Sequence, residues 1–491
     1  MKEITFTIDS YSFSTVPNNS CCREQCCSEI SDKTGKTYFW MREETGNKNW
    51  VLYNPNEYYV RKDSEYRCEH LHLSHSFKGK VHLPINASSC CGMFNGLDLA
   101  QLDFSEIDTS NIVDMSEMFD SCKLGKTFTP IFNTSNVKTM RMMFMDCEKT
   151  EEMDLSHFDV SKVVDLSQML SGCLDLEKIN LAGWNTESAE DLCGMFSNCY
   201  TIKELDLSHF STDNLKYMGY MFSNCSSLEW INLAGWDFSQ VVDMSELFCQ
   251  CGNLIEITIT AEPNSTKRLE YASEMFNGCE SLATINLAWL DLSKVSSVSN
   301  MFECCTVLEE LDLSKVNAKA IKYFDCIFEG CSNLVQLDVS KFDTSKVVTM
   351  FCMFSGCYKL IQLNLSNFDT KRVTNMASLF HNCQALAKLD ISSFDTSQVT
   401  DMGAMFTYCS KLTQLDFTLF DTRNVTDTRW MFEHCEKLTT IFISDKWSMD
   451  RVTNAMDMFK ECCSLPGFSP EKTGIEMAKP TEQGGYLTLK K

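Results

Sequence analysis

The chain has 491 residues, of which 44% are hydrophobic, and a formal net charge of −24 with no run of Lys and Arg. This charge argues against a nucleic-acid partner and against an anionic membrane surface, because both are bound through clustered basic side chains. The longest apolar stretches fall short of the roughly 18 residues of a membrane-spanning helix, so we expect no membrane insertion.

Residues 1–88 contain no repeat, and we expect them to form an N-terminal cap region. Met1–Ser20 is polar, without the basic start and apolar run of a signal peptide. Aromatic residues such as Trp40 and Trp50 alternate with polar ones further along. This pattern predicts short strands that cover the first coil of a stacked structure, whose core would otherwise meet water.

The same region gathers possible metal ligands in two groups. They are Cys21, Cys22, Cys26 and Cys27, and then Cys68, His70, His72 and His75. Neither group has the ligand spacing typical of zinc sites. We therefore expect no metal and no cofactor, with a metal-binding activity in the N-terminal cap as an alternative.

From residue 89 to 465, cysteine recurs, usually every 26 residues, at the end of a block that reads Met-Phe-x-x-Cys. A fixed period over most of a chain predicts a solenoid of stacked coils. The cysteines of this ladder are Cys122, Cys147, Cys173, Cys199, Cys225, Cys251, Cys279, Cys305, Cys331, Cys357, Cys383, Cys409, Cys435 and Cys462.

One repeat predicts two elements. In 399–409 the apolar residues are spaced by three, three, one and three, which is typical of one face of a short helix. In 412–417 the last apolar residues alternate with polar ones, as in a half-buried strand. Stacking predicts an α/β solenoid of about 14–15 repeats of 26 residues. Its curved parallel sheet would form the concave face, and its short helices the convex face.

The ladder cysteines allow two interpretations. Stacked coils would bring neighbouring Cα atoms to about 5 Å, within disulfide range. Their Cβ vectors would run parallel, however, and Met and Phe accompany each cysteine, which is typical of small buried hydrophobes. We favour a ladder of reduced, buried thiols and keep a stack of disulfides as the alternative.

Residues 466–491 lose the repeat and are expected to form a C-terminal cap. Within them, 484–489 reads Gly-Gly-Tyr-Leu-Thr-Leu, which predicts a last strand that closes the final coil.

The repeat resembles that of the BspA-like leucine-rich repeat surface proteins. Residues 342–366 read Phe-Asp-Thr-Ser-x-Val-x-x-Met-x-x-Met-Phe-x-x-Cys-x-x-Leu-x-x-Leu-x-Leu-Ser, which is similar to that family's repeat. The resemblance implies a leucine-rich-repeat solenoid and a surface or secreted protein that binds host or neighbouring-cell proteins. It implies no enzymatic activity.

One polar position lies between the two apolar residues of each predicted strand, and period two directs it away from the core onto the concave face. A column of carboxylates there would attract a basic partner or a cation. Alternatively, these side chains satisfy edge amides or stay solvated. The candidate partner-binding residues are Asp103, Asp154, Asp206, Asp312, Asp338, Asp390 and Asp416.

No glycine-rich phosphate loop, nucleophile elbow or zinc-binding histidine pair occurs in the sequence. We therefore predict a monomeric, non-enzymatic recognition and adhesion module that binds a protein through its concave face, at the cell surface or secreted. An intracellular leucine-rich-repeat scaffold is the alternative, since no signal peptide or anchor is visible.

Overall fold

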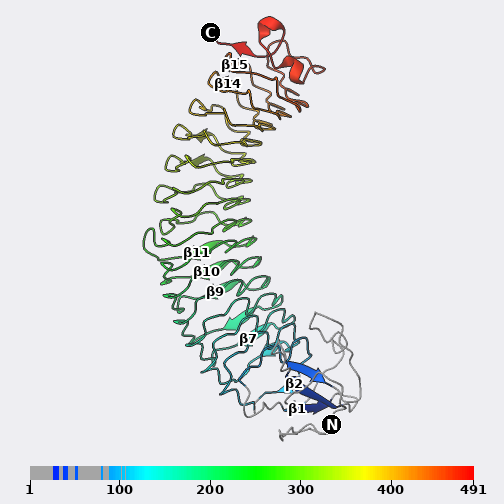
Figure 1. Ribbon diagram of the computed structural model, residues 1–491, viewed down its shortest axis with the longest axis vertical. Coiled ribbons are helices and arrows are strands. Elements are labelled where there is room, and N and C mark those ends of the chain that lie inside the picture. The colour runs from blue at the N-terminus through cyan, green and yellow to red at the C-terminus, as the bar shows by residue number, and fades with distance from the viewer. Residues whose placement is uncertain are drawn as a thin grey trace. The chain divides into compact units, whose positions relative to one another are not determined.

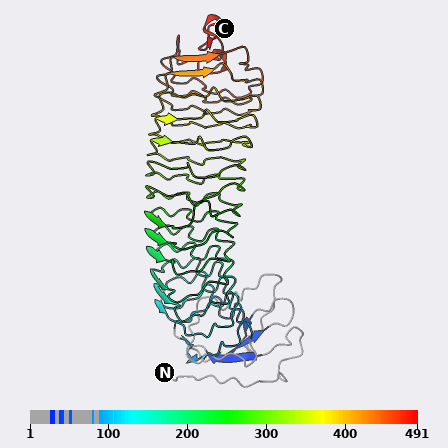
Figure 2. The same cartoon turned by 90° about the vertical axis from the view of Figure 1, so that its left-hand side faces the viewer.

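The computed structural model describes residues 88–100, 104 and 107–490. It describes the backbone alone of residues 26–31, 37–42, 50–53, 79–80 and 102–103. The chain forms two compact units, Met1–Leu228 and Glu229–Lys491. In each unit similar coils lie one above another, and their short strands line up on one side (Figure 1 and Figure 2).

Among its described residues, the first unit contains nine strands. These are β1 (Cys26–Ser31), β2 (Thr37–Arg42), β3 (Trp50–Tyr53), β4 (Gly79–Lys80), β5 (Leu102–Asp103), β6 (Thr127–Phe128), β7 (Glu152–Asp154), β8 (Lys178–Asn180) and β9 (Glu204–Asp206). Strands β1, β2 and β3 form an antiparallel sheet. The pairs β4–β5, β6–β7 and β7–β8 are parallel.

The described part of the second unit, up to residue 490, contains seven strands and two short 3₁₀ helices. They are β10 (Trp230–Asn232), β11 (Glu256–Thr258), β12 (Gln336–Leu337), β13 (Gln362–Leu363), β14 (Gln414–Phe417), β15 (Thr440–Ile443), η1 (Ile475–Met477), η2 (Thr481–Gln483) and β16 (Thr488–Leu489). All its strand pairs are parallel.

The strands pair in a register of one repeat. Leu337 lies opposite Leu363, and Leu415 opposite Ile441, each pair being 26 residues apart. A second ladder of single bridges links Thr349, Asn375 and Asp401, again one repeat apart. The predicted leucine-rich-repeat solenoid, with parallel strands and a 26-residue period, is therefore confirmed.

The predicted short helices are wrong. Within the part of the chain that the structure describes, each Met-Phe-x-x-Cys block is a run of turns, and the two 3₁₀ helices lie after the repeats. The N–H of Cys409 donates to the carbonyl of Phe406, three residues back, at 3.0 Å. The N–H of Phe406 instead donates to Met431 of the next coil at 2.9 Å. An α-helix would need these donors to bond four residues back.

Two positions in every block have the left-handed backbone conformation that the turns require. They lie one and five residues before the ladder cysteine, for example Tyr408 (φ 61°) and Ala404 (φ 52°). Glycine and asparagine adopt this conformation at least cost. They occupy the position before the cysteine in half of the fourteen blocks, as Gly172, Asn198, Asn224, Gly278, Gly330, Gly356 and Asn382.

The core of each unit is built from columns of identical side chains. Phe354 is fully buried between Phe328 and Phe380, with ring centroids 5.9 and 5.8 Å away and nearly parallel planes. A second column consists of buried threonines that join coils. Thr370 accepts the N–H of Asp395 at 2.7 Å and donates its hydroxyl to that residue's carbonyl at 2.9 Å. Stacking thus buries the phenylalanine rings and also satisfies the hydroxyl of Thr370.

The last coil is covered by the segment after the repeats. Strand β16 pairs with β15, placing Leu489 opposite Ile443. Tyr486 is buried against Phe459 at 5.5 Å, and its hydroxyl accepts the N–H of Ser469 at 2.8 Å. None of the helices among the described residues is long and apolar enough to cross a membrane.

We expect Phe354→Ala to destabilise the second unit by about 3–5 kcal/mol, because it removes a fully buried ring. Contacts in a solenoid are between neighbouring coils, so hydrogen exchange should accelerate mainly in the coils on either side. Tyr358→Ala, at a side chain that is 44% exposed, is the matched control. Equal acceleration throughout the unit would contradict this prediction.

A turn and a helix predict opposite effects on stability when a glycine is replaced by alanine. Gly356 has φ 71°, and an added Cβ would lie 3.2 Å from the backbone of Gly330. Gly356→Ala should therefore destabilise by about 1–2 kcal/mol, whereas in a helix alanine would stabilise by about 1 kcal/mol. Asn382→Gly, at φ 61°, should be close to neutral. Urea unfolding of both variants measures the two signs.

Candidate functional site

Six of the seven predicted partner-binding aspartates, all except Asp103, lie at equivalent positions in or beside the strand segments and share one local structure. In each, Oδ1 accepts the backbone N–H two residues further on, as Asp312 does from Ser314 at 2.9 Å. The equivalent distances are 2.9–3.0 Å for Asp154, Asp206, Asp338, Asp390 and Asp416. The backbone of Asp103 lies in β5, and its side chain is outside the described residues.

Asparagine makes the same turn where it occupies this position. The N–H groups of Ala182, Ala234, Ala288 and Ser366 donate to Asn180, Asn232, Asn286 and Asn364 at 3.0–3.1 Å. An amide oxygen therefore serves the turn as well as a carboxylate oxygen does. The negative charge of the aspartates is not required by the local fold.

Asp206, Asp312, Asp338 and Asp390 are exposed, and Asp154 and Asp416 are half-buried. Hydrogen bonds from Ser340 lower the pKa of Asp338, and hydrogen bonds from Ser392 lower that of Asp390. The charge of the column is partly compensated, since Lys341 acts on Asp338 and Lys490 Nζ lies 2.9 Å from Asp416 Oδ2. The column is thus a row of anionic positions with basic groups at some of its edges.

The ladder cysteines lie inside the coils, at most 1% exposed, and none of them is paired in a disulfide in the described structure. Cys357 Sγ donates to the carbonyl of Phe328 in the preceding coil at 3.2 Å, and Cys409 Sγ to that of Phe380 at 3.1 Å. Burial raises the pKa of both thiols from 9.0 to about 12. These side chains fill space and satisfy a second lone pair of a carbonyl whose other partner is an N–H.

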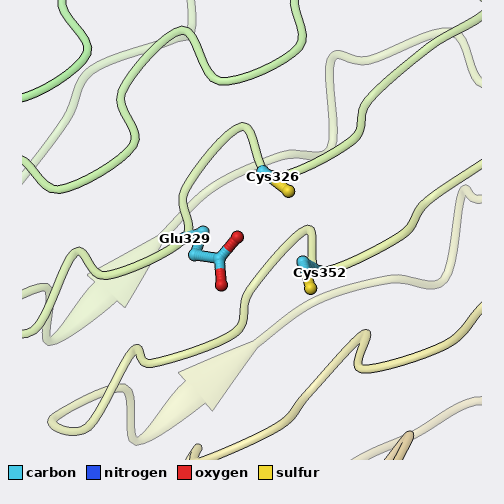
Figure 3. Close-up of side chains that lie close together, drawn as sticks. All are labelled: Cys326, Glu329 and Cys352. Carbon is cyan, nitrogen blue, oxygen red and sulfur yellow. The ribbon is translucent and has the colours of Figure 1, made fainter. Parts of the chain in front are cut away.

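A cluster that the sequence analysis missed lies on the turn side of the second unit. Cys326, Glu329 and Cys352 bring their ligand atoms within 4.8 Å of one another, and Figure 3 shows the Glu329 carboxylate directed toward the two thiols. Cys326 and Cys352 occupy the same position of consecutive repeats. A hydrogen bond with Cys352, burial and the nearby Glu329 all raise the pKa of Cys326 far above its ordinary value.

A second cluster has the same positions with the residue types exchanged. Glu246 and Glu274 stand where Cys326 and Cys352 do, and Cys249 stands where Glu329 does, again with all ligand atoms within 4.8 Å. The signal in the sequence was a Cys-x-x-Glu or Glu-x-x-Cys segment whose first residue type returns one repeat later. The cysteine and histidine groups between residues 21 and 75 lie outside the residues whose side chains the structure describes.

A family model described as "Mycoplasma protein of unknown function, DUF285" matches residues 88–204, 165–282, 270–365 and 359–467. No curated protein matches the chain.

Several solved structures are similar in part. A leucine-rich repeat protein from Eubacterium ventriosum is 15% identical, with 70% of this chain and 84% of that chain covered and a TM-score of 0.32. TLR13, in a complex with ssRNA13, is 14% identical, with 77% and 70% covered and a TM-score of 0.22. The Drosophila Toll–Spatzle complex is 12% identical, with 88% and 54% covered and a TM-score of 0.23. Superpositions at these TM-scores carry no weight for function.

The raised thiol pKa values predict a loss of stability in alkali. As the pH rises above 9.0, thiols of the unfolded chain ionise, while Cys409 stays protonated in the fold until about pH 12. The stabilisation is therefore full below pH 9.0 and is lost between these two values, by up to about 1.4 kcal/mol per pH unit for each thiol.

Urea midpoints across this pH range measure the effect. Cys409→Ala should reduce the steepness of the loss more than Cys463→Ala does, because Cys409 is buried whereas Cys463 is exposed, although the pKa of the Cys463 thiol is raised too. A midpoint independent of pH would contradict the prediction. Alkylation at mildly alkaline pH should likewise label Cys463 rapidly and the ladder only after denaturation.

Proposed function

Since this chain belongs to the DUF285 family over residues 88–467, whose description assigns no function, we propose a function from its surfaces: a non-enzymatic recognition module that binds a protein through the strand face. The observation that carries the proposal is the aspartate column. Its carboxylates make a turn that asparagine makes equally well at other coils, so their charge is available for a partner.

The partner that fits such a surface is a protein with basic side chains. Asp312 and Asp338 are exposed at the same position of consecutive coils, and hydrogen bonds from Ser314 and Ser340 keep their pKa values low. A row of ionised carboxylates raises the rate at which a cationic partner arrives. Spacing of about 4.8 Å between strands also suits an extended segment that contacts several coils.

The resemblance of the repeat to BspA-like proteins supports a place at the cell surface or outside the cell, with adhesion to host or neighbouring-cell proteins as the role. The intracellular scaffold would use the same face with a different partner. Fractionation of the source cells distinguishes the surface or secreted protein from the intracellular scaffold. In addition, protease added to intact cells reaches a surface protein and not an intracellular one.

The experiment starts from a partner captured with the full chain and then purified. We expect Asp312, Asp338 and Asp390 replaced together by Asn to keep the fold, because asparagine makes the same turn elsewhere. Association with the partner should slow, and the dependence of its rate on salt should weaken, because three steering charges are lost.

The matched control replaces Asp343, Asp369 and Asp395 by Asn. These residues accept N–H groups from Ser345, Lys371 and Ser397 in the same kind of turn, at the next corner of the coil. The control removes the same number of charges away from the strand position. Equal rates and salt dependence for wild type and the strand-face variant, or equal losses in both variants, would overturn the strand face as the binding surface.

A further inference from the structure

The turns of the second unit bring two thiols and one carboxylate together from adjacent coils. The N–H of Glu329 donates to the carbonyl of Cys326 at 3.0 Å, and this turn places the carboxylate beside the first thiol. The N–H of Cys326 donates to the carbonyl of Phe351 at 2.8 Å, which holds the next coil, with Cys352, in register. The backbone therefore fixes all three positions before any ligand arrives.

We propose that Cys326, Glu329 and Cys352 bind one thiophilic divalent cation, with Zn²⁺ as the best fit, as a clip between two adjacent coils. Zinc takes thiolate and carboxylate ligands in tetrahedral geometry, with bonds of about 2.3 Å to sulfur and about 2.0–2.2 Å to oxygen. Two sulfur ligands of one zinc ion are then about 3.8 Å apart. The ligand atoms here all lie within 4.8 Å of one another, which is close to the separation that one zinc ion requires.

The burial and hydrogen bonding of the three side chains support a bound cation. Cys352 is 7% exposed, and Cys326 and Glu329 are half-buried. Ser355 donates its hydroxyl to Glu329 Oε1 at 3.2 Å, which orients the carboxylate. Such a supporting hydrogen bond is what metal-binding carboxylates usually have. Three protein ligands leave the fourth position open to water or to a donor group of a partner.

The sequence places cysteine at this position of the repeat in two consecutive coils, and in none of the other ladder blocks. The equivalent cluster of Glu246, Cys249 and Glu274 has two carboxylates and one thiol. Because carboxylates are harder ligands than thiolates, this second cluster should bind Zn²⁺ or Co²⁺ more weakly than the first cluster. The exchange of ligand types at fixed geometry provides an internal comparison within one unit.

Cobalt titration tests the proposal, because Co²⁺ replaces Zn²⁺ and gives thiolate charge-transfer absorption and the visible bands of tetrahedral coordination. The full chain is reduced with a phosphine, stripped with a chelator and titrated with Co²⁺ alone, followed by displacement with Zn²⁺. We expect wild type to develop these bands and Zn²⁺ to abolish them. The C326S/C352S variant should lose one equivalent of thiolate-bound Co²⁺, and E329Q should bind it at least about tenfold more weakly.

The matched control is C193S/C463S, which removes two accessible cysteines outside the cluster and should titrate like wild type. Hydrogen exchange gives a second readout. Zn²⁺ should slow exchange of the amides of 326–330 and 352–356 in wild type and not in C326S/C352S. The proposal is overturned if reduced wild type develops no thiolate bands, if C326S/C352S keeps all of them, or if Zn²⁺ leaves exchange in these turns unchanged.

Discussion

The hydrogen bonds between neighbouring coils are the constraint on which the rest of the structure depends. Along one block the N–H groups alternate: Met405 donates three residues back, to Met402, and Phe406 donates to the next coil. No coil can therefore satisfy its own backbone. A buried N–H left without its acceptor costs about 1–3 kcal/mol, so each coil is stable only beside its neighbours, and their register is fixed at one repeat.

A fixed register turns each repeat position into a column. Phenylalanine at one position becomes a stack of rings that Leu170 interrupts. Cysteine at another position becomes a line of thiols bonded to the preceding coil, and aspartate at a third becomes a row of charge. Functional groups on this surface are therefore set by residues 26 apart rather than by neighbours in sequence. Cys326 and Cys352 meet in this way, as do the exposed aspartates of the strand face.

Much of this arrangement could be predicted from the sequence. The 26-residue period predicted the solenoid, and the alternation of apolar and polar residues after the cysteine predicted the strands. Both signals depend only on which side of a coil is buried. The helix was wrong because a spacing of three, three, one and three also fits successive turns that bond three residues back. Gly330, Gly356 and Asn382 before their cysteines were the distinguishing signal, since a left-handed backbone is incompatible with a helix interior.

The candidate site, likewise, could be predicted from the sequence only in part. Aspartate followed two residues later by serine is the pattern of a side chain that caps its own turn, so the local role of Asp338 could have been foreseen from Ser340. The cluster of Cys326, Glu329 and Cys352 could not be found by reading along the chain. It becomes visible only when the repeats are aligned as columns, because its two thiols are joined by the fold and not by a spacing that is typical of zinc sites.

The closing segment has a consequence for solubility. Strand β15 has β14 on one side and β16 on the other. If Tyr486 and β16 detached, the outer edge of β15 would present unpaired N–H and C=O groups beside exposed apolar side chains. Such an edge is a template for pairing, so the exposed edge of β15 would bind a strand of another chain. The short β16 therefore protects the edge of β15 from pairing with another chain.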